Sequence, residues 1–275
     1  MPGEAAAPRP GAAPDLPLRA FYAALRFAFD RLYGRQQMLH YPLCEGGTRG
    51  LAAGQAAFTE ACLARLGPLE GRRVLDVGCG NGLQTLHLAR TRSPGRVVGI
   101  DFNAAHVAMA REAAAGAPRV AFEVDDAQTL ASVADGSVDA ALCVESAHHY
   151  PDKDLFLANL RRVLAPGGRF VIADLLLRDD RRPGRLDRRL TLHHWRLDRY
   201  RTAAAAAGLR LEAAEDVTAR LLAGFENPEG WLEPEGRAGP AARAAARLIA
   251  RGLIRLYRHE LRHRFRYVIL SGGRA

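Results

Sequence analysis

Between residues 72 and 174, short runs of β-branched and other apolar residues alternate with segments whose apolar positions recur at helical spacing. The runs predict strands at 72–77, 96–101, 120–125, 138–144 and 169–174. Helices are predicted between them, at 82–91, 103–115 and 152–164. Because strands that alternate with helices form βαβ units, the pattern predicts an open α/β sheet of mainly parallel strands.

The segments before this alternating core have different patterns. Residues 1–17 are rich in Ala, Pro and Gly without periodic apolar positions, so we expect a disordered tail. Apolar residues at helical spacing within 18–66 predict an N-terminal helical cap. Residues 67–275 are expected to form the main domain, with a cap or lid inserted at about 178–260.

The inserted segment combines several elements. An Arg-rich stretch at 178–201 and an Ala-rich helix precede a candidate strand at 208–217. The looser residues 224–236 are expected to form a loop or lid. An amphipathic helix is predicted at 241–258, its arginines forming a solvated face or a contact for an anion or lipid. The apolar run 265–273 predicts a last strand.

The charge and the cysteines of the chain limit which functions are expected. A formal net charge of +9 is typical of nucleic-acid-binding proteins, but Lys153 is the only lysine among 39 basic residues. This arginine bias, in an Ala-, Gly- and Pro-rich chain, is typical of GC-rich coding sequence, so the charge alone does not indicate nucleic acid. Reduced thiols and no metal are expected, since metal-ligand and disulfide-framework spacings are both missing from Cys44, Cys62, Cys79 and Cys143.

Hydrophobic runs are too short for membrane insertion. None approaches the roughly 20 residues that span a bilayer, and the N-terminus has no signal-peptide stretch. We therefore expect a cytoplasmic protein without a membrane span, and leave contact with a lipid surface open.

A glycine-rich turn follows the first predicted strand. In VLDVGCGNG (74–82), Gly78, Gly80 and Gly82 allow the backbone to turn sharply and to approach a ligand closely. The dinucleotide fingerprint requires a further glycine where Leu83 stands, and the chain has no G-x-x-x-x-G-K-[ST] phosphate loop. The loop alone is therefore compatible with a nucleotide site or with a structural turn.

Acidic residues at the next strand ends favour a nucleoside ligand. Asp101 ends the second strand 21 positions after Gly80, where a carboxylate can accept hydrogen bonds from both ribose hydroxyls. Asp126 follows the third strand and can accept from an adenine amine, with a turn aspartate or a helix N-cap as the alternative explanation. Together with the glycine loop, these carboxylates predict a nucleoside site.

Five segments occur in the order and spacing of one known family: VLDVGCGNG, VVGID, VDDAQ, SVDAALCVES and LRRVLAPGGRFVIAD. Over residues 50–180 the chain resembles the class I methyltransferases that depend on S-adenosylmethionine (SAM). The resemblance implies a seven-stranded Rossmann-like sheet whose final strand lies antiparallel beside the fifth. It implies SAM as cofactor, with contacts from Asp76, Gly78, Cys79, Gly80, Asn81, Gly82, Asp101, Phe102, Asp126, Ala127 and Glu145.

The segment after the fourth strand bears on the acceptor. It reads ESAHHY rather than [ND]-P-P-[YF], and a Pro-Cys nucleophile is also missing, so nucleic-acid modification is not expected. VESAHHYPD followed by IAD resembles the branch that methylates hydroxyls of sugars, natural products and lipids. That resemblance implies His148 as the base and Asp174 as its partner. Candidates for the acceptor pocket, or else packing residues, are Tyr41, His149, Tyr150, His194 and Trp195.

Three functions follow from these features. The first is O-methylation of a small-molecule hydroxyl. The second is C-methylation of an isoprenoid or polyketide, in which Glu145 or a tyrosine stabilises a carbocation and arginines hold a diphosphate. The third is SAM binding without methyl transfer, as a partner or RNA-binding module. The acceptor, the regiochemistry and the oligomeric state, including a dimer, are left open.

Overall fold

A computed structural model of the chain describes residues 37–43, 50–180, 187, 192–226 and 239–275. The predicted tail, the first part of the N-terminal cap, Cys44 and most of the predicted lid at 224–236 lie outside these residues.

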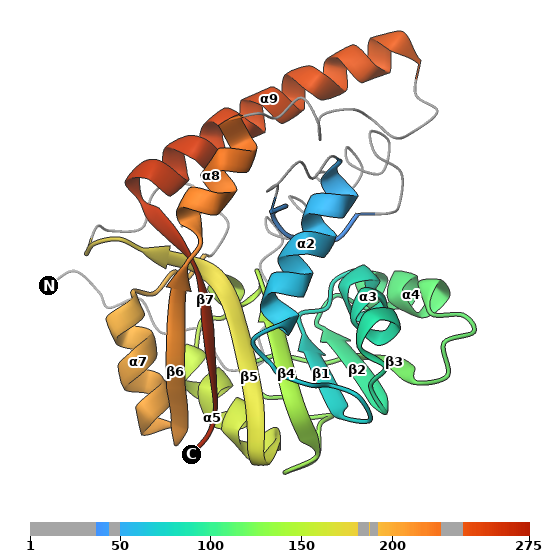
Figure 1. The fold of residues 1–275 in the computed structure, drawn as a ribbon, viewed down its shortest axis with the longest axis vertical. Helices are drawn as coiled ribbons and strands as arrows, with labels where there is room; N and C mark the ends of the chain where they lie inside the picture. Colours follow the sequence, from blue (N-terminus) through green and yellow to red (C-terminus); the bar gives the residue numbers. More distant parts are fainter. Residues whose placement is uncertain (1–36, 44–49, 181–186, 188–191, 227–238) are drawn as a thin grey trace, which may run out of the picture.

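A seven-stranded sheet in the order β3-β2-β1-β4-β5-β7-β6 forms the centre of the molecule (Figure 1). Its strands are β1 (Arg73–Val77), β2 (Arg96–Asp101), β3 (Val120–Val124), β4 (Val138–Val144), β5 (Leu164–Leu177), β6 (Leu209–Asp216) and β7 (Phe265–Arg274). The strands β1 to β5 pair in parallel, and β7 lies antiparallel between β5 and β6. The predicted open, mainly parallel sheet is therefore confirmed.

Helices cover both faces of the sheet. They are α2 (Leu51–Leu63), α3 (Leu83–Arg92), α4 (Ala104–Ala113), α5 (Lys153–Val163), α7 (Leu197–Ala206), α8 (Thr218–Glu226) and α9 (Pro240–His263), with a short 3-10 helix, η1 (Ala147–His149). The long helix α9 extends beyond the sheet at the top of Figure 1. Side chains alternate between the faces of a strand. Accordingly Val74 packs in one core cluster with Phe58 of α2, and Leu75 packs in another with Phe156 of α5.

Most element boundaries differ from the sequence prediction by one or two residues, and three elements differ by more. The helix predicted at 241–258 is α9, which extends to His263. The fifth strand extends over Leu164–Leu177 rather than 169–174, because its end continues to pair with β7 as far as Leu177 opposite Phe265. The predicted loop at 224–236 was wrong over its first three residues, which belong to α8. Leu221 and Phe225 are four positions apart and both are buried, so one helical face packs them into the core.

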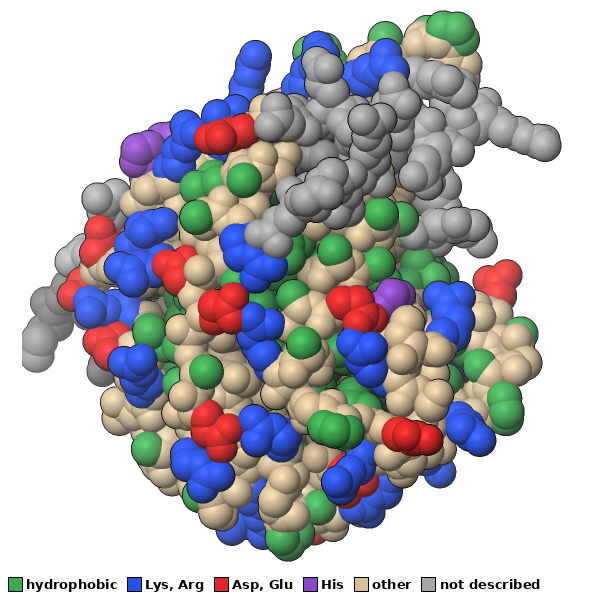
Figure 2. Space-filling view, in the orientation of Figure 1, with side chains coloured by type: hydrophobic (Ala, Val, Ile, Leu, Met, Phe, Trp, Pro, Cys, Tyr) green, Lys and Arg blue, Asp and Glu red, His purple; other side chains and the backbone are tan. Residues whose placement is uncertain are grey.

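Positive charge is distributed over the face shown in Figure 2, where Lys and Arg side chains are interleaved with Asp and Glu. Arg73 pairs with Asp139 at 2.7 Å, and Arg169 with Glu212 at 2.9 Å. Exposed ion pairs of this kind contribute only about 0–1 kcal/mol each. Within the residues that the structure describes, every helix is too short or too polar to cross a membrane.

Candidate active site

The glycine loop joins β1 to α3. The amides of Gly78 and Cys79 both donate to the carbonyl of Ile100 at 2.9 Å, which holds the loop against the end of β2. Gly78 has a φ of +73°, and a Cβ there would lie 2.4 Å from the Cβ of Ser146. A side chain at this position would therefore be strained and would also clash.

Asp101 meets this loop at the end of β2. Its Oδ2 accepts from the amide of Gly80 at 3.0 Å, and its Oδ1 accepts from the amide of Asn103 at 2.8 Å. The predicted proximity of Asp101 and the loop is thus present in the structure. Because a carboxylate offers about four acceptor positions, these two bonds orient Asp101 and leave capacity for two ribose hydroxyls. The loop and this carboxylate therefore fit the nucleoside part of SAM.

We expect Asp101→Asn to weaken SAM binding roughly 10- to 100-fold, because hydrogen bonds to a charged acceptor contribute about 1.5–3 kcal/mol. Isothermal titration calorimetry measures this directly. Asp139→Asn is the matched control, since Asp139 pairs with Arg73 at the start of β1. Equal SAM affinity in Asp101→Asn and the control would contradict the assignment.

Asp76 lies beneath the loop. Its side chain is fully buried, and its oxygens accept from Gln84 Nε2 at 3.0 Å and Thr85 Oγ1 at 2.7 Å. Burial raises the pKa of Asp76 to about 6, although these two bonds oppose the shift. The structure thus gives Asp76 a role in holding the start of α3, and its direct contact with SAM stays a prediction.

The remaining cofactor candidates line the loop and the strand ends. Asn81 donates from Nδ2 to the carbonyl of Gln37 at 2.6 Å, so the loop is tied to the segment 37–43. Asp126 accepts from the amide of Gln128 at 2.9 Å, the geometry of a turn aspartate. It is partly exposed, as is Phe102, whereas Cys79 and Ala127 are buried. Adenine contacts from Phe102, Asp126 and Ala127 stay predictions.

His148 and Asp174 form a buried pair between η1 and β5. His148 Nδ1 lies 2.5 Å from Asp174 Oδ1, which also accepts from the amide of Leu175 at 2.9 Å. Tyr200 donates from its hydroxyl to Asp174 Oδ2 at 3.3 Å. Burial disfavours the charged carboxylate, but the attraction and hydrogen bond of His148 outweigh it, so the pKa of Asp174 lies below its ordinary value. The pair is therefore a histidine ring held by an ionised carboxylate.

Two further histidines surround this pair. The ring of His194 stacks on that of His148 with centroids 5.4 Å apart, and His149 lies 4.1 Å from it. Burial and the neighbouring His148 lower the pKa of His194 to about 4 and that of His149 well below its ordinary value. Both are therefore neutral near pH 7 and shape the surroundings of His148 without adding charge.

Tyr150 and Trp195 both make packing or hydrogen-bond contacts within the protein. Tyr150 is buried and shares a 2.7 Å hydrogen bond with Ser146, whose Oγ donates to the carbonyl of Val77 at 3.1 Å. Trp195 is partly buried and packs edge-on against Tyr200 of the core cluster. Both residues support the strand ends, and their contact with an acceptor stays a prediction.

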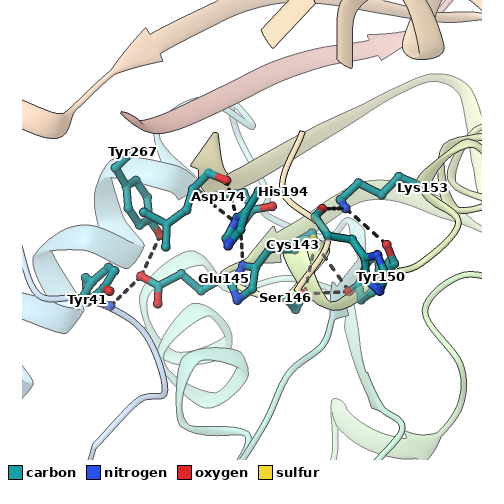
Figure 3. A network of polar contacts seen from close by, with 12 residues as sticks. Tyr41, Cys143, Glu145, Ser146, Tyr150, Lys153, Asp174, His194 and Tyr267 are labelled. Atoms are coloured by element: carbon teal, nitrogen blue, oxygen red, sulfur yellow. Dashed lines mark hydrogen bonds and ion pairs between the residues drawn. The ribbon is translucent and has the colours of Figure 1, made fainter. Parts of the chain in front are cut away.

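Glu145 connects the N-terminal segment to the last strand. Its Oε1 accepts from the amide of Tyr41 at 2.6 Å and from the hydroxyl of Tyr267 at 2.8 Å. The ring of Tyr41 packs edge-on against Tyr257 and Phe225, with centroids 4.9 and 5.8 Å away. Figure 3 shows Glu145 and its tyrosine partners on one side of Asp174, and Lys153 on the other. The contact of Tyr267 with Glu145 was not predicted from the sequence, where Tyr267 was only part of an apolar strand.

Glu145 should make stability depend on pH. Burial raises its pKa to about 8 from an ordinary 4.5, so the folded chain retains a proton that the unfolded chain releases. Its contribution to stability therefore falls as the pH rises from about 4.5 to 8. We expect Glu145→Gln to flatten the fall of Tm between pH 5 and 8. Glu212→Gln on exposed β6 is the control, and a slope equal to wild type in Glu145→Gln would contradict this.

Comparison with known proteins agrees with the fold and the loop. Residues 69–204 match a family model described as a methyltransferase domain. The 27-O-demethylrifamycin SV methyltransferase of Amycolatopsis mediterranei is 32% identical over 207 residues, which cover 72% of this chain and 75% of that protein. Methyltransferase GfsG of Streptomyces halstedii is 36% identical over 186 residues, or 64% of either chain.

A solved structure has the same fold. The geranyl diphosphate C-methyltransferase from Streptomyces coelicolor, in complex with Mg²⁺, geranyl-S-thiolodiphosphate and S-adenosyl-L-homocysteine, aligns with a TM-score of 0.71 and 19% identity, covering 86% of this chain and 87% of that one. At this identity the likeness shows the fold alone. Together with the sequence relatives and the glycine loop, it establishes that the chain belongs to the class I SAM-dependent methyltransferases and uses SAM as its cofactor.

Proposed function

We propose that this enzyme transfers a methyl group to a hydroxyl of a small natural product, with His148 as the general base. The observation that carries the proposal is the 2.5 Å contact between His148 Nδ1 and Asp174. Because Nδ1 is engaged by the carboxylate, Nε2 is the ring atom able to accept a proton from an acceptor hydroxyl.

When bound, SAM would supply an electrophilic methyl group, whose bond to sulfur breaks as the acceptor oxygen bonds to the methyl carbon, with S-adenosylhomocysteine as the leaving group. The protein's part is to position that oxygen and to take its proton. Asp174 fixes the His148 tautomer that carries its proton on Nδ1, so the basic Nε2 is free to receive the hydroxyl proton. The resulting imidazolium is stabilised by the ionised carboxylate. The neutral rings of His149 and His194 pack beside it and exclude water.

The name of the rifamycin relative supports this reading, since it denotes methylation of a molecule that lacks an O-methyl group. The test is a panel of hydroxylated polyketides, sugars and fatty acids assayed with methyl-labelled SAM, alongside prenyl diphosphates. Mass spectrometry and carbon NMR of each product distinguish an O-methyl from a C-methyl group. O-methylated product that depends on His148 supports the proposal, and turnover of prenyl diphosphates alone contradicts it.

A second candidate is C-methylation of an isoprenoid, favoured by the surroundings of Glu145. A carboxyl group bonded to the Tyr41 amide and the Tyr267 hydroxyl, beside a cluster of aromatic rings, can stabilise a developing cation. The predicted arginine contacts to a diphosphate have less support. Arg178 donates to the carbonyls of Leu261 and Phe265, so its guanidinium is already engaged.

A further inference from the structure

Lys153, the only lysine of the chain, is fully buried at the start of α5. Lysine is almost never fully buried unless its charge is compensated, because burying an ammonium group without partners is costly. Neither the cofactor loop nor the proton transfer described above uses this residue.

The contacts of its ammonium group join two parts of the site. Lys153 Nζ donates to the carbonyl of Tyr150 at 3.2 Å and to the carbonyl of His193. It also lies 5.3 Å from the ring centroid of Trp195. The amide of His193 in turn donates to the carbonyl of His148 at 2.7 Å. Lys153 thus links the loop that carries His148 to the segment 192–195, which carries His194.

We propose that Lys153 is a positioning residue, whose ammonium group holds the segment 192–195 against the loop 146–150 and thereby keeps His148 hydrogen-bonded to Asp174. The proposal uses the proposed function only in taking His148 as the base. The positioning itself is independent of which acceptor is methylated.

The charges around Lys153 suit this role. Burial lowers its pKa to about 8, whereas Asp174 and Cys143 act in the opposite direction. His149 and His193 also face it, and its charge lowers the pKa of both. Near pH 7 the ammonium form predominates and is compensated by the ionised Asp174. A compact ammonium with three donors reaches both carbonyls from a buried position, which the larger planar guanidinium of arginine does not match.

Arg199 provides a matched comparison. Its guanidinium lies 4.8 Å from the same Trp195 ring, but Arg199 is exposed and pairs with Asp154 on the surface. Replacing Arg199 by methionine removes a cation beside Trp195 and leaves the two backbone carbonyls bound to Lys153. An effect seen in Lys153→Met but not in Arg199→Met must therefore come from the hydrogen bonds of Lys153 to the two carbonyls.

The first test needs no acceptor and leaves Lys153 in place. Because the chain has one lysine, protein labelled with carbon-13 at lysine Cε gives a single side-chain NMR signal. We expect this signal to titrate near pH 8 in the wild type and at lower pH in Asp174→Asn, which removes the compensating charge. Titration at the ordinary lysine value in the wild type, or no response to Asp174→Asn, would overturn the proposal.

The second test measures whether His148 stays hydrogen-bonded to Asp174. A histidine Nδ1–H that is hydrogen-bonded to a carboxylate gives a far-downfield proton NMR signal. The signal of His148 is assigned by its loss in His148→Gln. We expect it to broaden in Lys153→Met and to persist in Arg199→Met. Amide exchange at 193–195 should become about ten-fold faster in Lys153→Met alone, since local opening is easier. SAM affinity should stay as in the wild type. A sharp His148 signal together with unchanged amide exchange at 193–195 in Lys153→Met would overturn the proposal. Neither the lysine titration nor the His148 signal requires that the acceptor be identified.

Discussion

Replacing His148 by alanine is expected to lower kcat by roughly 10²–10⁴-fold, the usual contribution of a positioned general base. A hydroxyl acceptor has a pKa far above neutrality, so its oxygen needs a base as the methyl group moves. His148 lies outside the glycine loop and Asp101, and SAM affinity should therefore change little. Asp174→Asn should cost less, because the base remains but loses its orienting carboxylate.

Steady-state kinetics and calorimetry with SAM check this expectation. His87→Gln is the control, because His87 pairs with Glu60 between α3 and α2, away from the proposed base. Near wild-type turnover in His148→Ala would contradict base catalysis and leave positioning of the acceptor as the mechanism.

Gly78→Ala is expected to destabilise the enzyme by about 2–5 kcal/mol and to weaken SAM binding, because it combines backbone strain with overpacking. The added Cβ would lie 2.4 Å from Ser146 side-chain atoms and 3.3 Å from the Tyr150 hydroxyl, so the loop must move. Gly67→Ala is the matched control. Gly67 has a similar φ of +77° and nothing within 4 Å of its added Cβ, so it isolates the strain.

Urea denaturation and SAM calorimetry of both variants separate the two causes. Gly67→Ala should cost about 1 kcal/mol and leave SAM binding unchanged. Adding Ser146→Gly to Gly78→Ala removes the clashing side chain and should restore part of the stability, a coupling that a double-mutant cycle measures. If Gly78→Ala and Gly67→Ala behaved alike, contact with Ser146 would not be what requires glycine at position 78.

Local pattern by itself determined much of the sheet. The strands at 96–101 and 138–144 were predicted with their exact bounds. Short runs of apolar and β-branched residues bounded by turns are typical of parallel strands that are buried on both faces. The meeting of Asp101 with the glycine loop also followed from the sequence. Adjacent parallel strands end at the same edge of a sheet, so residues at their carboxyl ends come together whatever the details of packing.

Tertiary structure decided which polar groups meet across distant elements. Glu145 lies 104 positions from Tyr41 and 122 from Tyr267, and nothing in either local pattern marks these partners. The sequence distinguishes Lys153 only as the single lysine of the chain, whereas packing buries it against the carbonyl of His193, 40 positions away. Periodicity records whether a side chain is buried, whereas hydrogen-bond partners and pKa shifts depend on how separate elements pack together.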